Sequence, residues 1–557
     1  MTEMVILVAA AVAAFGLAQR FRLPLIPLLI GCGFLLANVG LVTERANLAD
    51  ALDLGLAFLL FSAGIELNPQ RFRRHRQAVW WVAALQFLVV AAVGFLVGRG
   101  FGFTTMESLY VATALATSST LVVVRQLQHR VGARAGFGRL VIGVLFVQDV
   151  VMIVLLVMLA QLPAGGWAVV QGLGGVILLA AAAMVVQRWV AGRIIRGTHP
   201  DEEALLLLVI SLLFLFCALA FWLDLPIACG AFFAGLALSS FPANGVTRGL
   251  LRSLTTFFLA TFFTALGAHL QVPDFGLLLQ VLALVVLVWL ITPPLVAAVT
   301  EWKSGLTARS AITAGLLLAQ TSEFSLVLAL YGLQTNALSE DVFALITWVA
   351  VLSMTLTPFV ATDRIARRLL DWHPGHRRMR RQAAASSAGR ARLRDHVIML
   401  GYGSGGSWAL KPLQDHGHEV VVIDEDPAVV AQLEHMGLHA VRGDASDEQM
   451  LEEVDARHAR CVLISLPNPE DAARVAAGLR RHGVTVIARV FEHDHARPVE
   501  QAGAIPVLNS LAAADSFMEW FEGLAEEPPV HDPDHDRGEN APSVPGDNAG
   551  PVTDQPR

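Results

Sequence analysis

Long apolar runs fill the first two thirds of the chain, and each is about as long as a membrane-spanning helix. A helix needs about 20 mostly apolar residues to cross the hydrocarbon core of a bilayer. Thirteen runs, separated by short polar loops, approach this length. They cover residues 4–18, 24–40, 51–67, 78–98, 107–127, 138–160, 167–190, 203–223, 226–241, 254–270, 275–299, 308–333 and 342–361. The pattern therefore predicts a multi-span α-helical membrane domain over residues 1–362, with about 13 transmembrane helices.

The pattern of apolar positions changes after Thr362. Residues 363–394 form a basic linker. Short apolar runs then alternate with helix-like stretches, which is typical of a doubly wound parallel sheet. These runs cover residues 397–400, 420–423, 462–465 and 486–490. We therefore expect an α/β Rossmann-like domain over residues 395–525, followed by a disordered tail over residues 526–557 that is rich in Pro, Asp and Gly.

Charged residues divide the chain in the same way. Up to Thr362 there are 16 acidic and 19 basic residues, and beyond it there are 31 and 21, which excludes a single soluble domain. In the membrane part, 17 basic residues lie in loops that would face one side, against Arg45 and Arg99 on the other. Basic loops favour the cytoplasmic side, so we expect the N-terminus outside and the C-terminal domain in the cytoplasm of a bacterial inner membrane. The linker arginines would then face anionic membrane lipid rather than nucleic acid.

Three short sequences recur about 203 residues apart in the membrane part. The recurring pairs are Leu23-Pro24 and Leu225-Pro226, residues 64–67 and 267–270, and residues 115–120 and 318–323. Because this offset spans seven helices, an odd number, the second copy must be inverted relative to the first. We therefore expect six helices, one linker helix and six inverted helices, an architecture typical of secondary transporters.

The last of these pairs places polar residues in the middle of two apolar helices. The polar positions are Thr117, Ser118, Ser119 and Thr120 in the first copy, and Gln320, Thr321, Ser322 and Glu323 in the second. A single run of this kind could bond to its own helix. Two runs related by the repeat favour crossed, broken helices, since irregular backbone at membrane depth is tolerated where it lines a cavity. Glu323 would either compensate helix-end dipoles or bind an ion directly.

Asp149 is the acidic residue placed most deeply within a predicted span. Apolar residues flank it on both sides, and its counterpart in the second repeat is Leu352. Carboxylates within spans are costly and are therefore functional candidates. Burial favours the protonated form of a carboxyl group, whereas a nearby cation favours the anion, so a proton and a monovalent cation would compete for Asp149. Gln148 and the polar run at 117–120 would supply further oxygen ligands. The alternative is an aspartate held by a structural hydrogen bond.

A glycine-rich turn follows the first short strand of the C-terminal domain. The sequence 401–406 has the G-x-G-x-x-G pattern between a strand and a helix, which predicts a phosphate site at the helix N-terminus. The next strand ends in Asp424, about 20 residues on, where an acidic side chain binds ribose hydroxyl groups. The predicted nucleotide contacts are Gly401, Gly403, Ser404, Gly405, Gly406 and Asp424.

Several motifs together resemble the Kef-type branch of the monovalent cation:proton antiporters. They are Phe146-Val147-Gln148-Asp149, Ser118-Ser119-Thr120, Gly64-Ile65-Glu66-Leu67, Gly230-Ala231-Phe232-Phe233-Ala234-Gly235 and Gln320-Thr321-Ser322-Glu323-Phe324. The resemblance covers residues 4–525 and includes a regulator-of-potassium-conductance (TrkA-N-like) domain. The motif Gly443-Asp444-Ala445 is similar to one found in that domain. It implies a homodimeric elevator transporter that exchanges potassium, or sodium, for protons at the aspartate. It also implies an ancillary cytoplasmic regulator and a regulatory ligand, NAD(H) or an adenine nucleotide such as AMP or ATP, with Asp444 among its contacts.

The chain departs from this family's pattern at three places. Electrogenic relatives carry a second acid where Gln148 stands, and an intramembrane lysine in the span that here holds Pro293-Pro294. Both departures favour electroneutral exchange. Glutathione-gated members carry an acidic loop after the ninth span, whereas residues 241–248 contain no acid, so gating by glutathione is not expected.

Two functions from other classes compete with exchange. A nucleotide-gated potassium channel, or a subunit of one, would also pair membrane spans with this kind of domain, but it needs a filter loop such as T-V-G-Y-G, which the sequence lacks. A membrane-anchored redox enzyme would need a catalytic acid, base or nucleophile beside the dinucleotide fold. The four cysteines lie far apart and indicate neither a disulfide framework nor a thiolate metal site. We therefore expect a transporter and not an enzyme.

Overall fold

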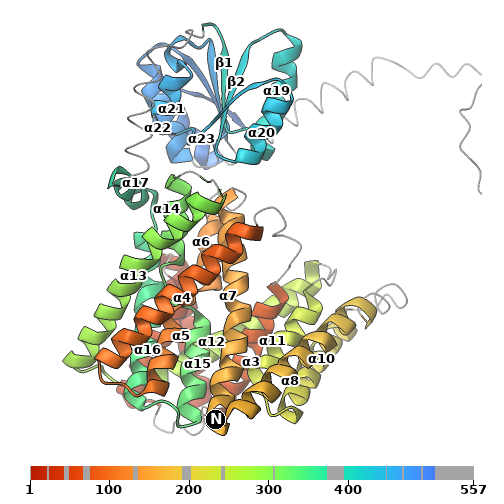
Figure 1. Cartoon of the computed structure of the whole chain (residues 1–557), viewed down its shortest axis with the longest axis vertical. Coiled ribbons are helices and arrows are strands. Elements are labelled where there is room, and N and C mark those ends of the chain that lie inside the picture. Colours follow the sequence, from red (N-terminus) through yellow and green to blue (C-terminus); the bar gives the residue numbers. More distant parts are fainter. Residues whose placement is uncertain are drawn as a thin grey trace, which may run out of the picture.

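Each of the thirteen predicted spans coincides with a helix, or with a pair of half-helices, in the computed structural model of the chain (Figure 1). The structure describes residues 2–21, 24–42, 49–66, 76–129, 136–190, 202–239, 245–304, 306, 308–372, 394–446, 448–466, 469–490 and 493–508. Among them, seven helices are long and apolar enough to cross a membrane, and six shorter apolar helices accompany them.

The helices of the first half run from the N-terminus to the predicted linker span. They are α1 (Thr2–Phe21), α2 (Leu25–Asn38), α3 (Ala49–Glu66), α4 (Arg76–Gly100), α5 (Thr105–Leu115), α6 (Thr120–His129), α7 (Gly136–Gln161) and α8 (Gly166–Val185). Those of the second half are α10 (Glu202–Trp222), α11 (Ile227–Leu238), α12 (Gly245–Ala268), α13 (Phe275–Ser304), α14 (Ala308–Leu318), α15 (Glu323–Gln334) and α16 (Glu340–Val360). A short amphipathic helix, α17 (Asp363–Trp372), follows.

The repeat found in the sequence is reproduced by the helix boundaries. The half-helices α5 and α6 are separated by residues 116–119, and α14 and α15 by residues 319–322. Both α14 and α15 begin 203 residues after their counterparts, at 308 and 323 against 105 and 120. The helices related by the repeat therefore break at equivalent positions, as the two polar runs predict.

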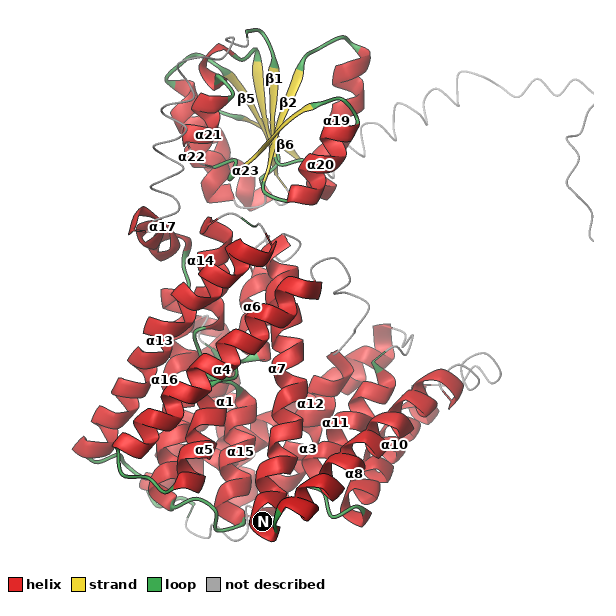
Figure 2. Cartoon of the chain, viewed as in Figure 1, coloured by secondary structure: helices red, strands yellow, loops and turns green. Residues whose placement is uncertain are grey.

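The membrane helices form two packed groups (Figures 1 and 2). In the first, which we call the panel bundle, α11 packs against α3, and α12 packs against α1, α2 and α3, while α10 packs against α11. In the second, the crossing bundle, α4 packs against α5, α7 and α13, α14 packs against α13, and α15 packs against α16. The predicted linker helix α8 contacts both α7 and α11, so it joins the two groups.

Glycine sets the closest helix contacts of the panel bundle. A Cβ atom at Gly33 or Gly267 would lie 1.8 or 2.0 Å from a backbone carbonyl oxygen of the facing helix. At Gly64 and Gly235 the corresponding distances are 2.2 and 2.1 Å. Small residues let membrane helices approach closely, which strengthens their van der Waals packing. Three of these four glycines belong to the repeated or family-like motifs of the sequence, and their structural role is this packing.

The C-terminal domain is a six-stranded parallel sheet covered by helices, with strand order β3-β2-β1-β4-β5-β6. Its strands are β1 (Val397–Leu400), β2 (Val420–Asp424), β3 (His439–Arg442), β4 (Cys461–Ile464), β5 (Thr485–Val490) and β6 (Ile505–Leu508). Its helices are α19 (Gly403–Asp415), α20 (Pro427–His435), α21 (Glu448–Glu453), α22 (Pro469–Arg480) and α23 (His493–Gln501). The doubly wound parallel sheet is thus confirmed. We call residues 394–508 the sheet domain.

Two strands of this sheet, β3 and β6, were not predicted. Both lie at its edges and have partly exposed side chains, whereas β1 and β2 are buried along their whole length. A strand buried on both faces gives a continuous apolar run, and an edge strand does not. The predicted tail, residues 526–557, lies outside the described residues.

Candidate functional site

The two broken helices meet in the crossing bundle and are bonded to each other at their breaks. Ser118 Oγ donates to the carbonyl oxygen of Leu318 at 2.7 Å, so the first break is bonded to the end of α14. In the opposite direction, Ser325 Oγ of α15 donates to the carbonyl oxygen of Ala114 at 2.6 Å. Thr117 Oγ1 lies 3.4 Å from the same Ser325 hydroxyl. These bonds satisfy carbonyl groups that the helix ends leave without an intrahelical partner.

Asp149 lies beside this crossing, in the middle of α7. Its side chain is 1% exposed. Thr120 Oγ1, on the first residue of α6, donates to Asp149 Oδ2 at 2.9 Å. The N-terminal end of a helix carries partial positive charge, so the start of α6 stabilises the negative charge of the Asp149 carboxylate. The structure thus brings together Asp149 and Thr120, two of the predicted ion-site residues.

Gln148 is bonded at both atoms of its side-chain amide. Its Oε1 accepts a hydrogen bond from the backbone N–H of Ser118 at 3.1 Å, and its Nε2 donates to Gln86 Oε1 at 2.9 Å. Gln86, on α4, also donates to Ser118 Oγ at 3.3 Å. The amide group of Gln148 therefore connects the first break to α4, and its role as an ion ligand stays a prediction. Gln86 was missed, although a single amide within the apolar run at 78–98 was a usable signal.

Glu323 is the first residue of α15, and its carboxylate reaches the other repeat. It is 2% exposed, and its Oε1 accepts from the backbone N–H of Leu121 at 3.3 Å. The next N–H of α6, on Val122, is bonded to Ser119 Oγ at 3.2 Å. Of the two roles open in the sequence, this contact corresponds to compensation of backbone donors at a helix start. Thr120 is the repeat counterpart of Glu323, so both side chains act at the start of α6.

The second break is held mainly by groups of its own repeat. The backbone N–H of Thr321 donates to Ser353 Oγ at 3.2 Å, and the two hydroxyl groups lie 3.0 Å apart. Ser353 is a residue of α16 that the sequence did not single out. Ser322 caps α15 by accepting from Phe324 N–H at 3.1 Å. Gln320 Nε2 donates to the carbonyl oxygen of Leu317 at 3.4 Å. Among the described residues, no group of three His, Cys, Asp or Glu side chains could hold a resident metal ion.

The predicted nucleotide site lies at the carboxyl ends of β1 and β2. Gly401 has a positive φ of 83°, and a Cβ atom there would lie 3.2 Å from the carbonyl oxygen of Ser465, so glycine is required at this turn. Asp424, the last residue of β2, accepts from Tyr402 N–H at 2.8 Å and from Asp426 N–H at 2.9 Å. This carboxylate therefore sits directly beside the glycine-rich turn.

The remaining predicted nucleotide contacts lie around the same edge of the sheet. Helix α19 begins at Gly403 and continues through Ser404, Gly405 and Gly406, whose side chains and burial are outside the described set. Asp444 follows β3, and its Oδ1 accepts from the N–H and the hydroxyl of Ser446 at 2.9 and 2.8 Å. Ligands of open α/β sheets bind at the carboxyl ends of the strands.

Comparisons with known proteins agree with this architecture. The family described as "Sodium/hydrogen exchanger, transmembrane" matches residues 6–362, and the TrkA-N domain matches residues 397–510. The glutathione-regulated potassium-efflux system protein KefC of Salmonella paratyphi B is 26% identical over 520 residues, which cover 87% of this chain and 79% of the relative. KefC of Shigella flexneri serotype 5b is 26% identical over 505 residues, covering 86% and 77%.

A solved structure shares the fold of the membrane part. The sodium proton antiporter MjNhaP1 of Methanocaldococcus jannaschii aligns with a TM-score of 0.51 at 14% identity, covering 66% of this chain and 97% of that protein. The exchanger match covers more than half of the chain. The chain therefore belongs to the sodium/hydrogen exchanger family of cation:proton antiporters, and it carries a C-terminal TrkA-N domain.

Proposed function

We propose that this antiporter exchanges potassium for protons, one for one, at Asp149. The observation that carries the proposal is the buried carboxylate of Asp149, which is 1% exposed and accepts a hydrogen bond from Thr120. Thr120 is the first residue of the half-helix α6, at the crossing of the two inverted repeats. Potassium is favoured over sodium because the relatives that match most of the chain are named potassium-efflux proteins. The name of those relatives also includes glutathione, which we do not carry over, since the loop at 241–248 contains no acid.

The exchange follows from the cost of an unneutralised charge inside the membrane. A carboxylate with neither proton nor cation is expensive to bury, so Asp149 crosses in a neutral state, bound to one or the other. Thr120 orients the carboxylate through its Oγ1 bond, and Gln148 fixes the first break through Ser118. Alternating access would come from movement of the crossing bundle against the panel bundle. With Gln148 in place of a second acid, the cycle carries no net charge.

The surroundings of the protein follow from the same reasoning. The excess of basic residues in alternate loops supports an N-terminus outside and a sheet domain in the cytoplasm, in a bacterial inner membrane. A homodimer and an ancillary cytoplasmic regulator are the proposed protein partners, and membrane lipid is the medium.

The sheet domain would regulate exchange by binding NAD(H) or an adenine nucleotide such as AMP or ATP. Support comes from the turn at Gly401, which only glycine fits, and from the position of Asp424 next to it. An acidic side chain at this position binds ribose hydroxyl groups. Asp444, at the end of the neighbouring strand, is the further proposed contact.

The test is exchange in proteoliposomes loaded with a pH-sensitive dye and given an acidic interior, so that the proton gradient is directed outward. Adding external potassium, or sodium in a parallel experiment, should dissipate the gradient in the wild type, at a rate unaffected by an imposed membrane potential. Asp149→Asn should abolish the signal. Asp53→Asn, the same change at an exposed carboxylate of α3, is the matched control and should retain it. Exchange that persists in Asp149→Asn would show that the site lies elsewhere.

A further inference from the structure

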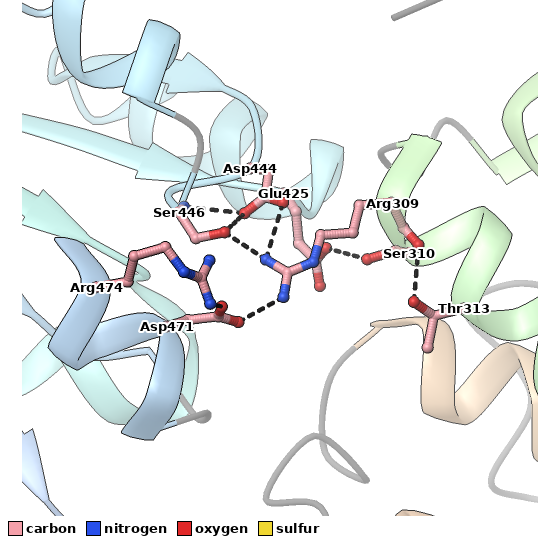
Figure 3. A network of polar contacts seen from close by, with 8 residues as sticks. All are labelled: Arg309, Ser310, Thr313, Glu425, Asp444, Ser446, Asp471 and Arg474. Carbon is pink, nitrogen blue, oxygen red and sulfur yellow. Dashed lines mark hydrogen bonds and ion pairs between the residues drawn. The ribbon is translucent and has the colours of Figure 1, made fainter. Parts of the chain in front are cut away.

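The ligand-binding edge of the sheet domain faces the crossing bundle. In the structure, the carboxyl ends of β2 and β3 and the start of α22 lie against the adjacent end of α14 (Figures 1 and 3). The residues at this edge include Glu425, which follows β2, Asp444, which follows β3, and Asp471 in the first turn of α22. Because ligands of such sheets bind at this edge, a contact here bears directly on ligand binding.

Arg309, the second residue of α14, inserts its side chain among these acidic groups. Its guanidinium lies 3.3 Å from Asp444 Oδ2 and 2.6 Å from Asp471 Oδ2, and it also donates to the hydroxyl of Ser446 (Figure 3). The side chain is 12% exposed, and that of Asp471 is 8% exposed. The next residue, Ser310, donates to Glu425. These are charge-assisted bonds in a largely desolvated contact, unlike those of an exposed ion pair.

A second contact ties the sheet domain to the helix that carries Asp149. Arg139, near the start of α7, lies 3.7 Å from the carboxylate of Asp426. Asp149 lies ten residues after Arg139 on α7. On α14, Leu318 lies nine residues after Arg309, and its carbonyl oxygen accepts the hydrogen bond from Ser118. At 1.5 Å per residue, each contact lies about 14–15 Å along a rigid helix from the crossing. The sheet domain therefore contacts the ends of both helices that position the ion site.

The contact involves groups that the proposed nucleotide needs. Asp444 is a proposed nucleotide contact, and in this structure its Oδ1 is bonded to Ser446 while its Oδ2 is bonded to Arg309. Glu425 and Asp426 directly follow Asp424, the proposed ribose anchor, in the same turn. A nucleotide that reached Asp444 Oδ2 would have to displace the guanidinium, because the side chain of Arg309, held by α14 and 12% exposed, already occupies the space beside this oxygen.

We propose that Arg309 and a nucleotide compete for the acidic edge of the sheet domain, so that docking of this domain on α14 and nucleotide binding exclude one another. The proposal rests on the proposed nucleotide regulation, and it identifies the Arg309 contact as the switch. Coupling between two binding events is reciprocal, so docking must weaken nucleotide binding by the same factor by which the nucleotide weakens docking, and a change that weakens the Arg309 contact must tighten nucleotide binding. Nucleotide binding, in turn, releases the ends of the helices that lead to Asp149.

The binding test uses the full chain purified in detergent, with NADH followed by its fluorescence and AMP followed by calorimetry. Arg309→Gln should bind the effective nucleotide about tenfold more tightly than the wild type, within the usual range of coupling factors. Asp471→Asn should have a similar effect, because it weakens the contact from the other side without altering a proposed nucleotide contact. The double variant should add little to either one. Arg125→Gln, which removes the same charge from an exposed position on α6, is the control and should bind like the wild type.

Each other outcome overturns the proposal. Equal affinity in Arg309→Gln and Arg125→Gln means that docking and binding are independent. Weaker binding in Arg309→Gln means that Arg309 is itself a nucleotide ligand. If neither NADH nor AMP binds the wild type or Arg309→Gln, the competition does not exist for these nucleotides.

A transport measurement separates this proposal from the ion-site assignment. In proteoliposomes, the nucleotide that binds should change the exchange rate of the wild type and leave that of Arg309→Gln unchanged. Exchange that survives in Asp149→Asn would refute the ion site without affecting the binding result. An exchange rate of Arg309→Gln that responds to nucleotide as the wild type does would refute the Arg309 switch while leaving Asp149 in place.

Discussion

Replacing Gly33 by alanine should separate two helices of the panel bundle. A Cβ atom at this position would lie 1.8 Å from the carbonyl oxygen of Thr264 and 3.0 Å from the backbone nitrogen of Ala268, both on α12. These are backbone atoms, so no side chain can rotate away to make room. Gly31, two residues earlier on the same helix, provides the control, because a Cβ atom there meets nothing within 4 Å.

The size of the effect follows from these distances. Real Cβ atoms essentially never approach another heavy atom closer than 3.0 Å, so α2 and α12 must move apart by at least 1.2 Å along this line, the difference between 3.0 and 1.8 Å. A gap of that size forfeits about half of the dispersion energy of the neighbouring contacts. Overpacking of a well-packed interior costs about 1–3 kcal/mol, and we expect the upper end here. Gly31→Ala should instead stabilise its helix by up to about 1 kcal/mol.

The assay compares thermal unfolding midpoints of wild type, Gly33→Ala and Gly31→Ala in the same detergent at one heating rate. The midpoint of Gly33→Ala should fall by several degrees, and that of Gly31→Ala should equal or exceed the wild-type value. Because unfolding of a membrane protein is often irreversible, the order of the three midpoints is the test rather than their absolute values. Equal midpoints for the two variants would refute the close approach of α2 and α12.

Four further changes have defined outcomes. Thr120→Val removes the donor to Asp149, worth about 1.5–3 kcal/mol for a bond to a charged group, so exchange at fixed pH should fall at least about tenfold, whereas Thr120→Ser should retain it; equal rates for the two variants would contradict this role. Gln86→Leu leaves the Gln148 amide without its acceptor and should cost about 1–3 kcal/mol of stability, seen as a lower unfolding midpoint; an unchanged midpoint would contradict it. Asp424→Asn should weaken NADH binding about tenfold in the fluorescence titration, the equivalent of one lost hydrogen bond, and full affinity would exclude Asp424 as the ribose anchor. Burial raises the pKa of the Cys461 thiol, so iodoacetamide should label this thiol more slowly in the native chain than in the urea-unfolded chain at pH 8. Because the pKa is higher in the folded state, the contribution of this thiol to stability is complete below the usual thiol pKa and is lost as the pH rises through the raised value. Cys461→Ser should remove this pH-dependent loss of stability.

Much of the fold could be read from the sequence because the membrane and the parallel sheet both impose strong patterns. A span must be apolar along its length, and a strand buried on both faces must be apolar at consecutive positions, as in β1 and β2. The edge strands β3 and β6 carry partly exposed side chains and gave no such pattern. The breaks at 116–119 and 319–322 were predicted because polar residues recur there at one offset.

The candidate ion site was predicted less completely than the fold. Asp149 and Thr120 were named and meet in the structure, whereas the bond of Gln148 to the first break was not foreseen. Gln86 and Ser353 lie on helices that the repeat did not mark as broken; Gln86 was a lone amide in an apolar run, whereas no local pattern marked Ser353. Their roles depend on which helices become neighbours, and that information is not contained in the spacing of residues along one helix.

The sequence by itself determined the spans, the inverted repeat, the position of the two breaks, the Rossmann-like domain and the buried carboxylate, because each depends on local composition or on a fixed spacing along the chain. The tertiary structure decided which groups meet at each break, which glycines permit the close contacts of the panel bundle, and where the sheet domain sits. Arg309 and Asp444 are 135 residues apart, and the sequence singled out only Asp444, as a nucleotide contact. Their contact arises because folding places the carboxyl edge of the sheet against the end of α14, where the opposite charges form a largely desolvated ion pair.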